Sequence, residues 1–390
     1  MMLATALYMA GSLALFAGEG QDTKKVDAKK LREIQSFERE LDEDRRIGKE
    51  AAEYYDKEYK PTKDAASQKR VEELGAKLAL IANSQAGFKT LWGEKRQFML
   101  EYKFKVVDSK DINAVCLPGG YIYVYDGLVK FAQSDDELAG VLAHEICHAS
   151  QRHLAYMQKE QAKMGAMQIP LILASILTGS NAGLMAGSLV GTALTNGWSV
   201  KAEESADNGG VQLLIATGYN PTAMITFMER LQMEQGAMEK VVDLGIFRTH
   251  PPSRKRADAI ESFMKSNAIP IRRSAVTNTF RVTASEFAPG TYQLKFGERK
   301  LFAVGGDNPK AKAAELTKRL NDFFDTVPEM YEITIGDQGE VFGRSKLLVR
   351  FDEDDAEVNA TTVQKMQEDA SKALRSCAFS LAYHIWEGRG

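Results

Sequence analysis

Cysteine is scarce in this sequence. The 390 residues include only three cysteines, at positions 116, 147 and 377. Three cysteines are too few for a disulfide framework, and their odd number leaves at least one free thiol in a monomer. We interpret Cys147 as a small buried apolar residue, with a redox or metal role as the alternative.

An excess of charge of either sign is also missing. The 50 Lys and Arg residues and the 53 Asp and Glu residues leave a net charge of −3, without a strongly basic patch. Nucleic acid is therefore not expected as a partner. The hydrophobic content of 44% and the charged content of 26% are typical of a globular protein, and the length suits two or three domains.

No unbroken apolar run is long enough to span a membrane. Residues 164–200 carry no charge, but Pro170 and several glycines divide them. A transmembrane helix needs about 20 apolar residues, and the most apolar piece, 169–177, is shorter. We expect two short buried helices here, close to the functional site, with peripheral membrane contact or a mobile lid as alternatives.

The apolar N-terminus lacks the positive charges that usually precede a secretory signal. Residues 1–17 are uncharged and apolar, and Gly18-Glu19-Gly20 follows them with small residues suited to cleavage. We expect residues 1–20 to be a signal peptide or, because Lys and Arg are missing before the apolar run, an N-terminal membrane anchor. Either way, the rest of the protein is expected to be periplasmic or otherwise extracytoplasmic.

The most informative stretch is DDELAGVLAHEICHASQRH at residues 135–153. Ser134 and Glu137 are typical of a capping box, and apolar residues then recur at helical spacing, so we expect one helix. His144 and His148 stand four residues apart. This spacing places both imidazoles on one helix face, where they can bind the same cation.

Glu145 completes a His-Glu-x-x-His motif with these two histidines. A zinc ion lowers the pKa of a water molecule to about 7. A neighbouring carboxylate can take the proton of that water and later give it to a leaving amine, so the motif predicts two ligands and a general base. The alternative is a chance match on an ordinary amphipathic helix, and a third ligand is needed to decide.

A second predicted helix, over residues 199–217, supplies the candidate third ligand. Glu203 and Asp207 lie four residues apart on one of its faces. Acidic residues on a helix are usually solvated, but this helix follows an uncharged stretch that would bury them, and a metal stabilises a buried carboxylate. We expect Glu203 to be the ligand and Asp207 to accept a hydrogen bond from a ligand imidazole. Glu204 points about 100° away and serves as an internal control.

His250 lies in the motif Thr249-His250-Pro251-Pro252. A loop histidine is ordinarily a surface residue, but two prolines hold this one rigidly at the start of a helix. It is a candidate donor to an oxyanion, or a ligand that competes with substrate for the metal.

The remaining elements follow from periodicity. A charged helix is predicted within residues 24–60, docked along a stripe of Leu31, Ile34, Phe37 and Leu41. A second helix follows Pro61, and strands are predicted at 102–106 and 121–125. After residue 269 we expect strands near 292–296, 301–304, 331–335 and 347–351 and two amphipathic helices, without candidate chemistry.

Four separated motifs occur together in the order found in one protein family. They are Asn113-Ala114 with Leu117-Pro118-Gly119-Gly120-Tyr121, Glu137-Leu138-Ala139 with His144-Glu145-Ile146-Cys147-His148, Glu203 with Ala206-Asp207 and Gly218-Tyr219-Asn220-Pro221, and Thr249-His250-Pro251 with Arg256. Over about residues 40–265, the chain resembles metallopeptidase family forty-eight, the group of HtpX-like and CAAX prenyl proteases. It looks most similar to the soluble periplasmic members.

The resemblance, together with the order of the elements predicted after residue 269, which lie outside it, indicates an α+β fold class. We expect a mainly helical gluzincin-type catalytic domain with a small β-sheet edge, followed by a small α+β C-terminal domain. The expected limits are 21–60 for the charged helical segment, 61–268 for the zinc metallopeptidase domain and 269–390 for the C-terminal domain, whose role is unknown.

The resemblance also implies residue roles. His144, His148 and Glu203 would bind one zinc ion per chain, Glu145 would activate the water, and Asp207 would support a ligand histidine.

The substrate side of the site is implied in the same way. Asn113 would lie in the substrate cleft, and His250 would stabilise the oxyanion or gate the metal. Gly119, Gly120 and Tyr121 would bind substrate, because the strand around residues 120–123 would pair with an extended peptide.

The function implied is a zinc endopeptidase of the cell envelope that cleaves extended or misfolded proteins, as in protein quality control. Its partners are therefore protein or peptide substrates, and the oligomeric state stays open. One alternative is a metal-stabilised binding or chaperone-like module that cleaves little. A weaker one is an enzyme acting on a non-protein amide.

Overall fold

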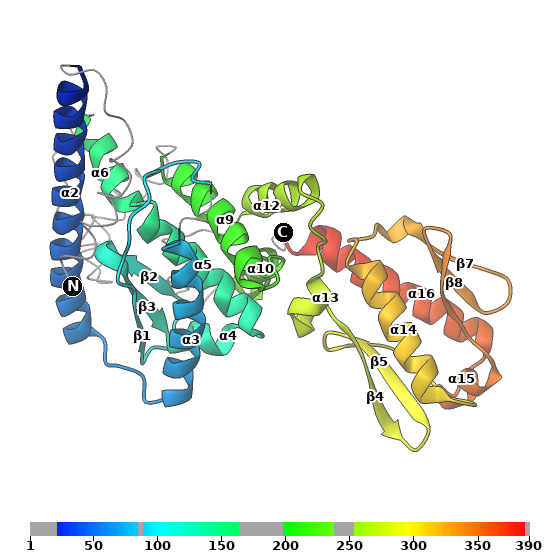
Figure 1. Ribbon diagram of the computed structural model, residues 1–390. Helices are drawn as coiled ribbons and strands as arrows, with labels where there is room; N and C mark the ends of the chain where they lie inside the picture. Colours follow the sequence, from blue (N-terminus) through cyan, green and yellow to red (C-terminus); the bar gives the residue numbers. More distant parts are fainter. Residues whose placement is uncertain (1–21, 85–88, 164–197, 238–252, 387–390) are drawn as a thin grey trace.

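The computed structural model describes residues 22–84, 89–163, 198–237 and 253–386, which form two lobes side by side (Figure 1). The first lobe is mainly helical with one small sheet, and the second combines two small sheets with helices. Each lobe has its own apolar core. The expected fold class, a mainly helical α+β domain followed by a small α+β domain, is confirmed.

A three-stranded sheet lies inside the first lobe. Its strands are β1 (Lys103–Val107), β2 (Ala114–Leu117) and β3 (Tyr121–Tyr125). β3 is central, parallel to β1 and antiparallel to β2, and residues 121–124 pair on both sides. A peptide therefore cannot add to β3 as a new strand. This corrects the expectation that residues 120–123 pair with an extended substrate.

The side chains of β3 alternate between the two faces of the sheet. Ile122 and Val124 enter the main core, whereas Tyr123 and Tyr125 enter a smaller cluster shared with α2 (Asp22–Glu58). In that cluster the hydroxyl of Tyr55 lies 2.7 Å from the hydroxyl of Tyr125. α2 therefore covers one face of the sheet.

The contacts of α2 differ from the predicted stripe. Phe37 and Leu41 are buried, but Leu31 is 56% exposed and Ile34 is 38% exposed. The predicted docking of the first half of the stripe is wrong. α2 makes a much closer contact at Gly48, where an added Cβ would lie 1.8 Å from the carbonyl oxygen of Pro118. Pro118 belongs to the short turn η1 (Pro118–Gly120).

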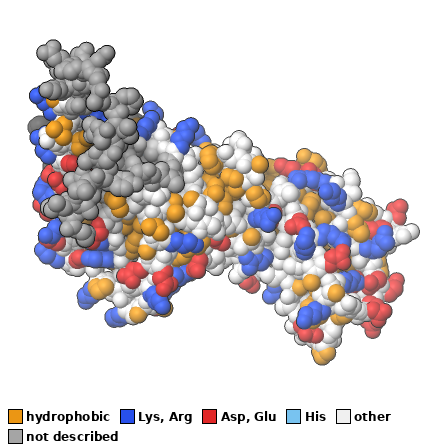
Figure 2. Space-filling view, in the orientation of Figure 1, with side chains coloured by type: hydrophobic (Ala, Val, Ile, Leu, Met, Phe, Trp, Pro, Cys, Tyr) orange, Lys and Arg blue, Asp and Glu red, His pale blue; other side chains and the backbone are white. Residues whose placement is uncertain are grey.

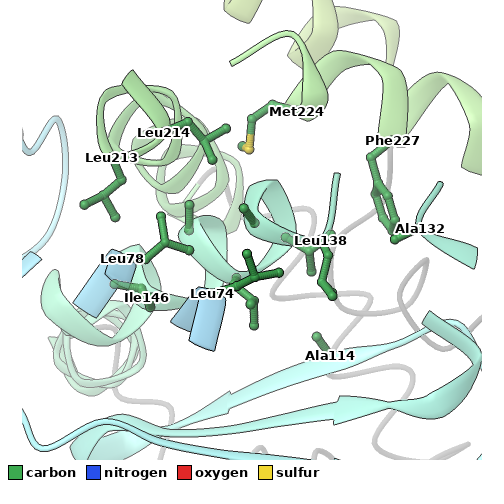
Figure 3. Close-up of a cluster of buried hydrophobic side chains, with 14 of the residues drawn as sticks. Leu74, Leu78, Ala114, Ala132, Leu138, Ile146, Leu213, Leu214, Met224 and Phe227 are labelled. Atoms are coloured by element: carbon green, nitrogen blue, oxygen red, sulfur yellow. The ribbon is translucent and has the colours of Figure 1, made fainter. Parts of the chain in front are cut away.

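Four helices meet over the other face of the sheet. They are α3 (Ala65–Ala82), α5 (Asp135–Ser150), α9 (Trp198–Thr217) and α10 (Ala223–Ala237), and the short α4 (Asp126–Phe131) leads from β3 to α5. Figure 3 shows the main core between them, formed by residues that include Leu74, Leu78, Leu138, Ile146, Leu213, Leu214 and Met224. The helix predicted after Pro61 is confirmed as α3.

α5 begins where the sequence predicts but ends earlier. The Ser134 hydroxyl accepts a hydrogen bond from the N–H of Glu137 at 3.2 Å. Glu137 does not complete a capping box, because its buried carboxylate accepts from the N–H of Gln133 and pairs with Arg230 of α10. The helix ends at Ser150. α6 (His153–Lys163) follows after Arg152, whose φ of 51° is left-handed.

The second lobe contains two similar units in succession. Each is a three-stranded antiparallel sheet followed by a long helix. The first unit comprises β4 (Val282–Ala288), β5 (Thr291–Phe296), β6 (Arg299–Val304) and α14 (Pro309–Phe324). The second comprises β7 (Ile333–Ile335), β8 (Glu340–Gly343), β9 (Lys346–Arg350), the short α15 (Glu353–Val358) and α16 (Val363–Phe379). The sequence did not predict β4 or β8.

The chain joins the two lobes at two places. α12 (Arg254–Ser266), α13 (Arg273–Val276) and the turn η2 (Asn278–Phe280) lead into the second lobe. There the side chain of Gln133, next to the start of α5, donates to the Thr279 hydroxyl at 3.0 Å and accepts from the Thr277 hydroxyl. Near the C-terminus, Trp386 packs against both cores, and Figure 1 shows this end of the chain between the lobes.

The surface is mixed in character. On the face drawn in Figure 2, hydrophobic side chains gather near the middle, and side chains of both charges are interspersed over the second lobe. Within the described ranges, no helix combines the length and apolarity needed to cross a membrane. The predictions for residues 1–20, and for the short helices within 164–197, lie outside the described residues.

Candidate metal centre

α5 and α9 bring the three predicted ligands together. His144 and His148 come from α5 and Glu203 from α9. The Nε2 atoms of the two histidines are 3.0 Å apart, and carboxylate oxygens of Glu203 lie 3.4 Å from Nε2 of His144 and 3.3 Å from Nε2 of His148. Three donor atoms, contributed by residues far apart in sequence, thus surround one small space. Glu204, the internal control, is not in this group.

α9 packs closely on α5 near Gly210. A Cβ at this position would lie 3.5 Å from the backbone nitrogen of His144, an ordinary contact distance, and 3.1 Å from Cε of Met224. This close packing of α9 on α5 lies about two helical turns from Glu203.

The donor atoms fit a divalent cation in spacing and in charge. Ligands held tetrahedrally at about 2.1 Å from an ion lie about 3.4 Å from one another, close to the separations observed here. Glu145, Glu203 and Asp207 are buried carboxylates, and the guanidinium of Arg256 pairs with the last two. Among these described groups the buried carboxylates outnumber the buried guanidinium, and a divalent cation would compensate the excess.

Asp207 orients the first histidine. Its carboxylate lies 3.0 Å from Nδ1 of His144 and accepts two hydrogen bonds from Arg256, at 2.7 and 2.8 Å. Burial alone would raise the pKa of Asp207, but the charges and hydrogen bonds of Arg256 and His144 lower it to about 2. Because Asp207 is ionised, it requires a proton on Nδ1 of His144, which leaves Nε2 for a metal.

The two histidines have opposite pKa shifts. Burial alone would lower the pKa of His144, but the hydrogen bonds and charges of Asp207 and Glu203 raise it to about 10. For His148, burial outweighs the opposing effect of Glu203, and the neighbouring histidines add to it, so the pKa falls well below its usual value. In the metal-free protein His144 is therefore the protonated member of the pair.

His148 meets a third histidine on its other side. Nδ1 of His148 lies 2.8 Å from Nδ1 of His153. The other nitrogen of His153, Nε2, lies 3.1 Å from the carbonyl oxygen of Trp92 and 3.0 Å from Oε1 of Gln151. No role for His153 is predicted from the sequence, because five residues along an unbroken helix would turn it about 140° away from His148.

Arg256 is the second residue whose role the sequence did not reveal. It belongs to the motifs that carry the family resemblance, yet nothing in the sequence pairs it with Glu203 and Asp207. Its helix, α12, begins after Ser253, whose hydroxyl accepts from the N–H of Arg256 at 3.2 Å. This cap places the guanidinium against α9.

Glu145 and Asn113 are both buried. Glu145 is 1% exposed and adjoins His144 on α5, and Asn113 directly precedes β2. Oδ1 of Asn113 has no hydrogen-bond partner among the described residues. Such an amide oxygen can accept a bond from a bound peptide. The catalytic roles of both residues stay predictions, and His250 lies outside the described residues.

Backbone conformation and close packing explain why glycine occupies positions 119 and 120, which were predicted to bind substrate. Gly119 and Gly120 have left-handed φ angles of 76° and 93°. An added Cβ would lie 3.1 Å from Cα of Arg45 at Gly119, and 3.0 Å from the carbonyl oxygen of Glu101 at Gly120. Tyr121 is half-buried at the start of β3. Contact of these residues with substrate stays a prediction.

Comparison with known proteins identifies relatives of the first lobe. The sequence model of peptidase family M48 matches residues 65–264. The beta-barrel assembly-enhancing protease of Yersinia pestis is 32% identical over 169 residues, which are 40% of this chain and 34% of the relative. The mitochondrial metalloendopeptidase OMA1 of Schizosaccharomyces pombe is 33% identical over 165 residues, which are 42% of this chain and 47% of the relative.

A third relative is covered more fully. The metalloprotease LoiP of Escherichia coli strain K12 is 28% identical over 167 residues, which are 43% of this chain and 64% of the relative. By contrast, this chain spans about a third of the length of the beta-barrel assembly-enhancing proteases that it matches.

Proposed function

This chain belongs to peptidase family M48, and from that premise we propose that it is a zinc-dependent endopeptidase of the cell envelope. Its substrates are extended or misfolded proteins, so that it serves protein quality control. The names of the relatives, which include metalloproteases and a protease that enhances beta-barrel assembly, support this proposal.

The observation that carries the proposal is the convergence of His144, His148 and Glu203 beside Glu145. Two nitrogens and one carboxylate, with a position left open, are a typical donor set for a catalytic zinc ion. The unbalanced negative charge of the site supports the same ion.

A zinc ion bound there supplies Lewis-acid chemistry, since it polarises a carbonyl group and lowers the pKa of a water molecule to about 7. Glu145 takes the proton of the attacking water and later gives it to the leaving amine. Asp207 holds His144 in the tautomer that keeps Nε2 available. Arg256 keeps Asp207 ionised and lies 3.1 Å from the Glu203 carboxylate.

The shape of the sheet supports an extended substrate. Among the described residues, β2 pairs with β3 on one side and with no strand on the other. Backbone groups of residues 114–117 on that open side can pair with an extended peptide, which gives affinity with little dependence on sequence. Asn113, at the start of this edge, would receive the peptide N–H.

The experiment that tests the proposal compares wild type with Glu145→Gln. Zinc content is measured by elemental analysis, and cleavage of unfolded casein is measured with and without a chelator. We expect the variant to keep one zinc ion and to lose about 10²–10⁴-fold in rate. Glu204→Gln is the control, because it makes the same change on α9 outside the donor group.

Two outcomes would contradict the proposal. If Glu145→Gln cleaves casein as fast as wild type, Glu145 is not the base. If wild type binds zinc but cleaves no unfolded protein, the alternative of a metal-stabilised binding module is favoured.

A further inference from the structure

We propose that His153 is a positioning residue for the zinc ligand His148. It holds the ring of His148 in place and fixes the tautomer whose Nδ1 carries the proton, so that Nε2 is available to the metal. This inference rests on the proposed function, because it takes His148 to be a zinc ligand.

Three groups, His148, His153 and the carbonyl of Trp92, form a row of hydrogen bonds. Which atom donates in each bond follows from the Trp92 carbonyl at the end of this row. The carbonyl oxygen of Trp92 can only accept, so Nε2 of His153, at 3.1 Å, must donate to it. With Nε2 as the donor, Nδ1 of His153 can accept from Nδ1 of His148, at 2.8 Å. His148 in turn has its lone pair on Nε2, the atom that faces His144 and Glu203. A backbone carbonyl thus determines the tautomer of both rings.

The geometry also shows that His153 is not a further ligand. Its Nδ1 faces the nitrogen of His148 that points away from the donor group, and the ring centroids are 4.8 Å apart at 81°. His153 is 1% exposed. Its relation to His148 matches that of Asp207 to His144, so each ligand histidine has a partner at its outer nitrogen.

A strained turn places His153 in this position. Arg152 has a φ of 51°, a left-handed conformation that is unfavourable for a residue with a side chain. Its buried guanidinium is held by Asp44 at 2.6 Å and Glu40 at 2.9 Å, both on α2, and Glu94 lies 3.6 Å away. These ion pairs stabilise the turn that brings the chain back beneath His148.

The segment that contains Trp92 packs closely against the turn at residues 151–153. Gly93 has a φ of 103°, and an added Cβ would lie 2.4 Å from the carbonyl oxygen of Gln151 and 2.9 Å from Cδ2 of His153. The N–H of Glu94 donates to that carbonyl of Gln151 at 2.7 Å. Glycine at 93 therefore allows the Trp92 carbonyl to reach His153.

Ser205 connects this arrangement to α9. Its hydroxyl accepts from the N–H of Trp92 at 2.9 Å, and it lies 3.1 Å from the Trp92 carbonyl and 2.5 Å from Oε1 of Gln151. Because Ser205 is two residues after Glu203, the groups that hold His153 are tied to the helix that supplies the third ligand.

The test is a pair of substitutions that differ in one hydrogen bond. His153→Phe keeps a flat ring but cannot accept. His153→Asn places Oδ1 near the position of the lost Nδ1 and can accept. Tyr156→Phe is the matched control, because Tyr156 lies on α6 and packs on Trp92 but its hydroxyl bonds to Glu94. Zinc affinity is measured by competition with a chelator, and the unfolding free energy of each metal-free protein is measured in urea.

We expect His153→Phe to weaken zinc binding by about 10–100-fold, His153→Asn to recover most of that affinity, and Tyr156→Phe to match wild type. The inference is overturned if His153→Phe binds zinc as tightly as wild type, whatever its metal-free stability, or if Asn and Phe weaken binding equally. If His153→Phe does not fold, His153→Gln replaces it, since its acceptor lies one bond too far. Failure of wild type to bind zinc would instead contradict the proposed function.

Discussion

At the scale of single residues, Arg256 compensates two buried carboxylates of the metal-free site, together with the protonated His144. Its guanidinium lies within 3.1 Å of both Glu203 and Asp207 in a buried environment. Removing one partner of a buried ion pair leaves the other charges without compensation, which costs about 3–5 kcal/mol.

We therefore expect Arg256→Gln to lower the unfolding free energy of the chelator-treated protein by about 3–5 kcal/mol. Added zinc should reduce this loss, since the ion compensates the same carboxylates. Arg254→Gln is the control, because Arg254 begins the same helix but is largely exposed. Urea unfolding of both variants, with and without zinc, tests this. Equal stability of the two variants would count against the electrostatic role of Arg256.

The pKa of His144 predicts how zinc binding depends on pH. In the folded metal-free protein this pKa is raised to about 10, from a usual value of 6.5. The stabilisation that comes from protonating His144 is present below about pH 6.5 and is lost as the pH rises towards 10. Zinc needs the neutral ring, so it must displace this proton.

We accordingly expect zinc affinity to rise about tenfold per pH unit between pH 7 and 8.5, with the release of about one proton per ion. His148 contributes no second proton, because its pKa is lowered. Calorimetry in buffers with different ionisation enthalpies measures the number of protons directly. An affinity that is constant over this range would contradict the protonated state of His144.

Sequence reasoning reached the residues that helical spacing, local composition and the family motifs single out. His144, His148 and Glu203 were found this way, and the charge-free stretch before Glu203 pointed to its burial. His153 could not be found, because its position depends on the left-handed conformation of Arg152. That conformation is held by Glu40 and Asp44, which lie over 100 residues earlier in the chain.

At the scale of elements, the contact between α2 and η1 reverses an ordinary rule. Replacing glycine by alanine inside a helix usually stabilises it by about 1 kcal/mol. At Gly48 the added methyl group would lie 1.8 Å from the Pro118 carbonyl oxygen, so α2 would have to move away from the sheet.

We therefore expect Gly48→Ala to destabilise the protein by about 1–3 kcal/mol and to make α2 more accessible to protease. Lys49→Ala, at the next and exposed position, is the control. Urea unfolding and limited proteolysis measure the two effects. If Gly48→Ala instead raises the unfolding free energy, α2 can move away from Pro118 without loss of stability, and the prediction is wrong.

The elements that sequence reasoning missed are those that depend on tertiary contacts. β2 has four residues and β8 has four, too few to show a clear alternation of apolar and polar residues. β4 is largely exposed beyond its first residue, Val282. Leu31 and Ile34 have helical spacing but are exposed, which helical spacing alone does not reveal.

At the scale of the whole molecule, the second lobe has a core that is separate from that of the first. Its buried apolar residues run from Phe280 to Ile385 and include side chains from both sheet-and-helix units. We expect a fragment of residues 278–386 to unfold cooperatively, with a free energy of about 5–15 kcal/mol.

Near-ultraviolet circular dichroism and urea unfolding of this fragment provide the measurement. The fragment 278–362 is the control, because it lacks α16 and its buried residues, and it should not unfold cooperatively. If the longer fragment also lacks a cooperative transition, the second lobe needs the first lobe in order to fold.

The double connection between the lobes limits how they can move. A body attached along residues 274–279, where Ser274 also bonds to Asp325 at the end of α14, and again at Trp386 can turn without breaking either attachment only about the line that joins these two places. Gln133 lies at one end of that axis, directly before α5. Rotation of the second lobe would therefore change which surface it presents to a passing polypeptide while leaving the start of α5, and the histidines farther along it, almost stationary.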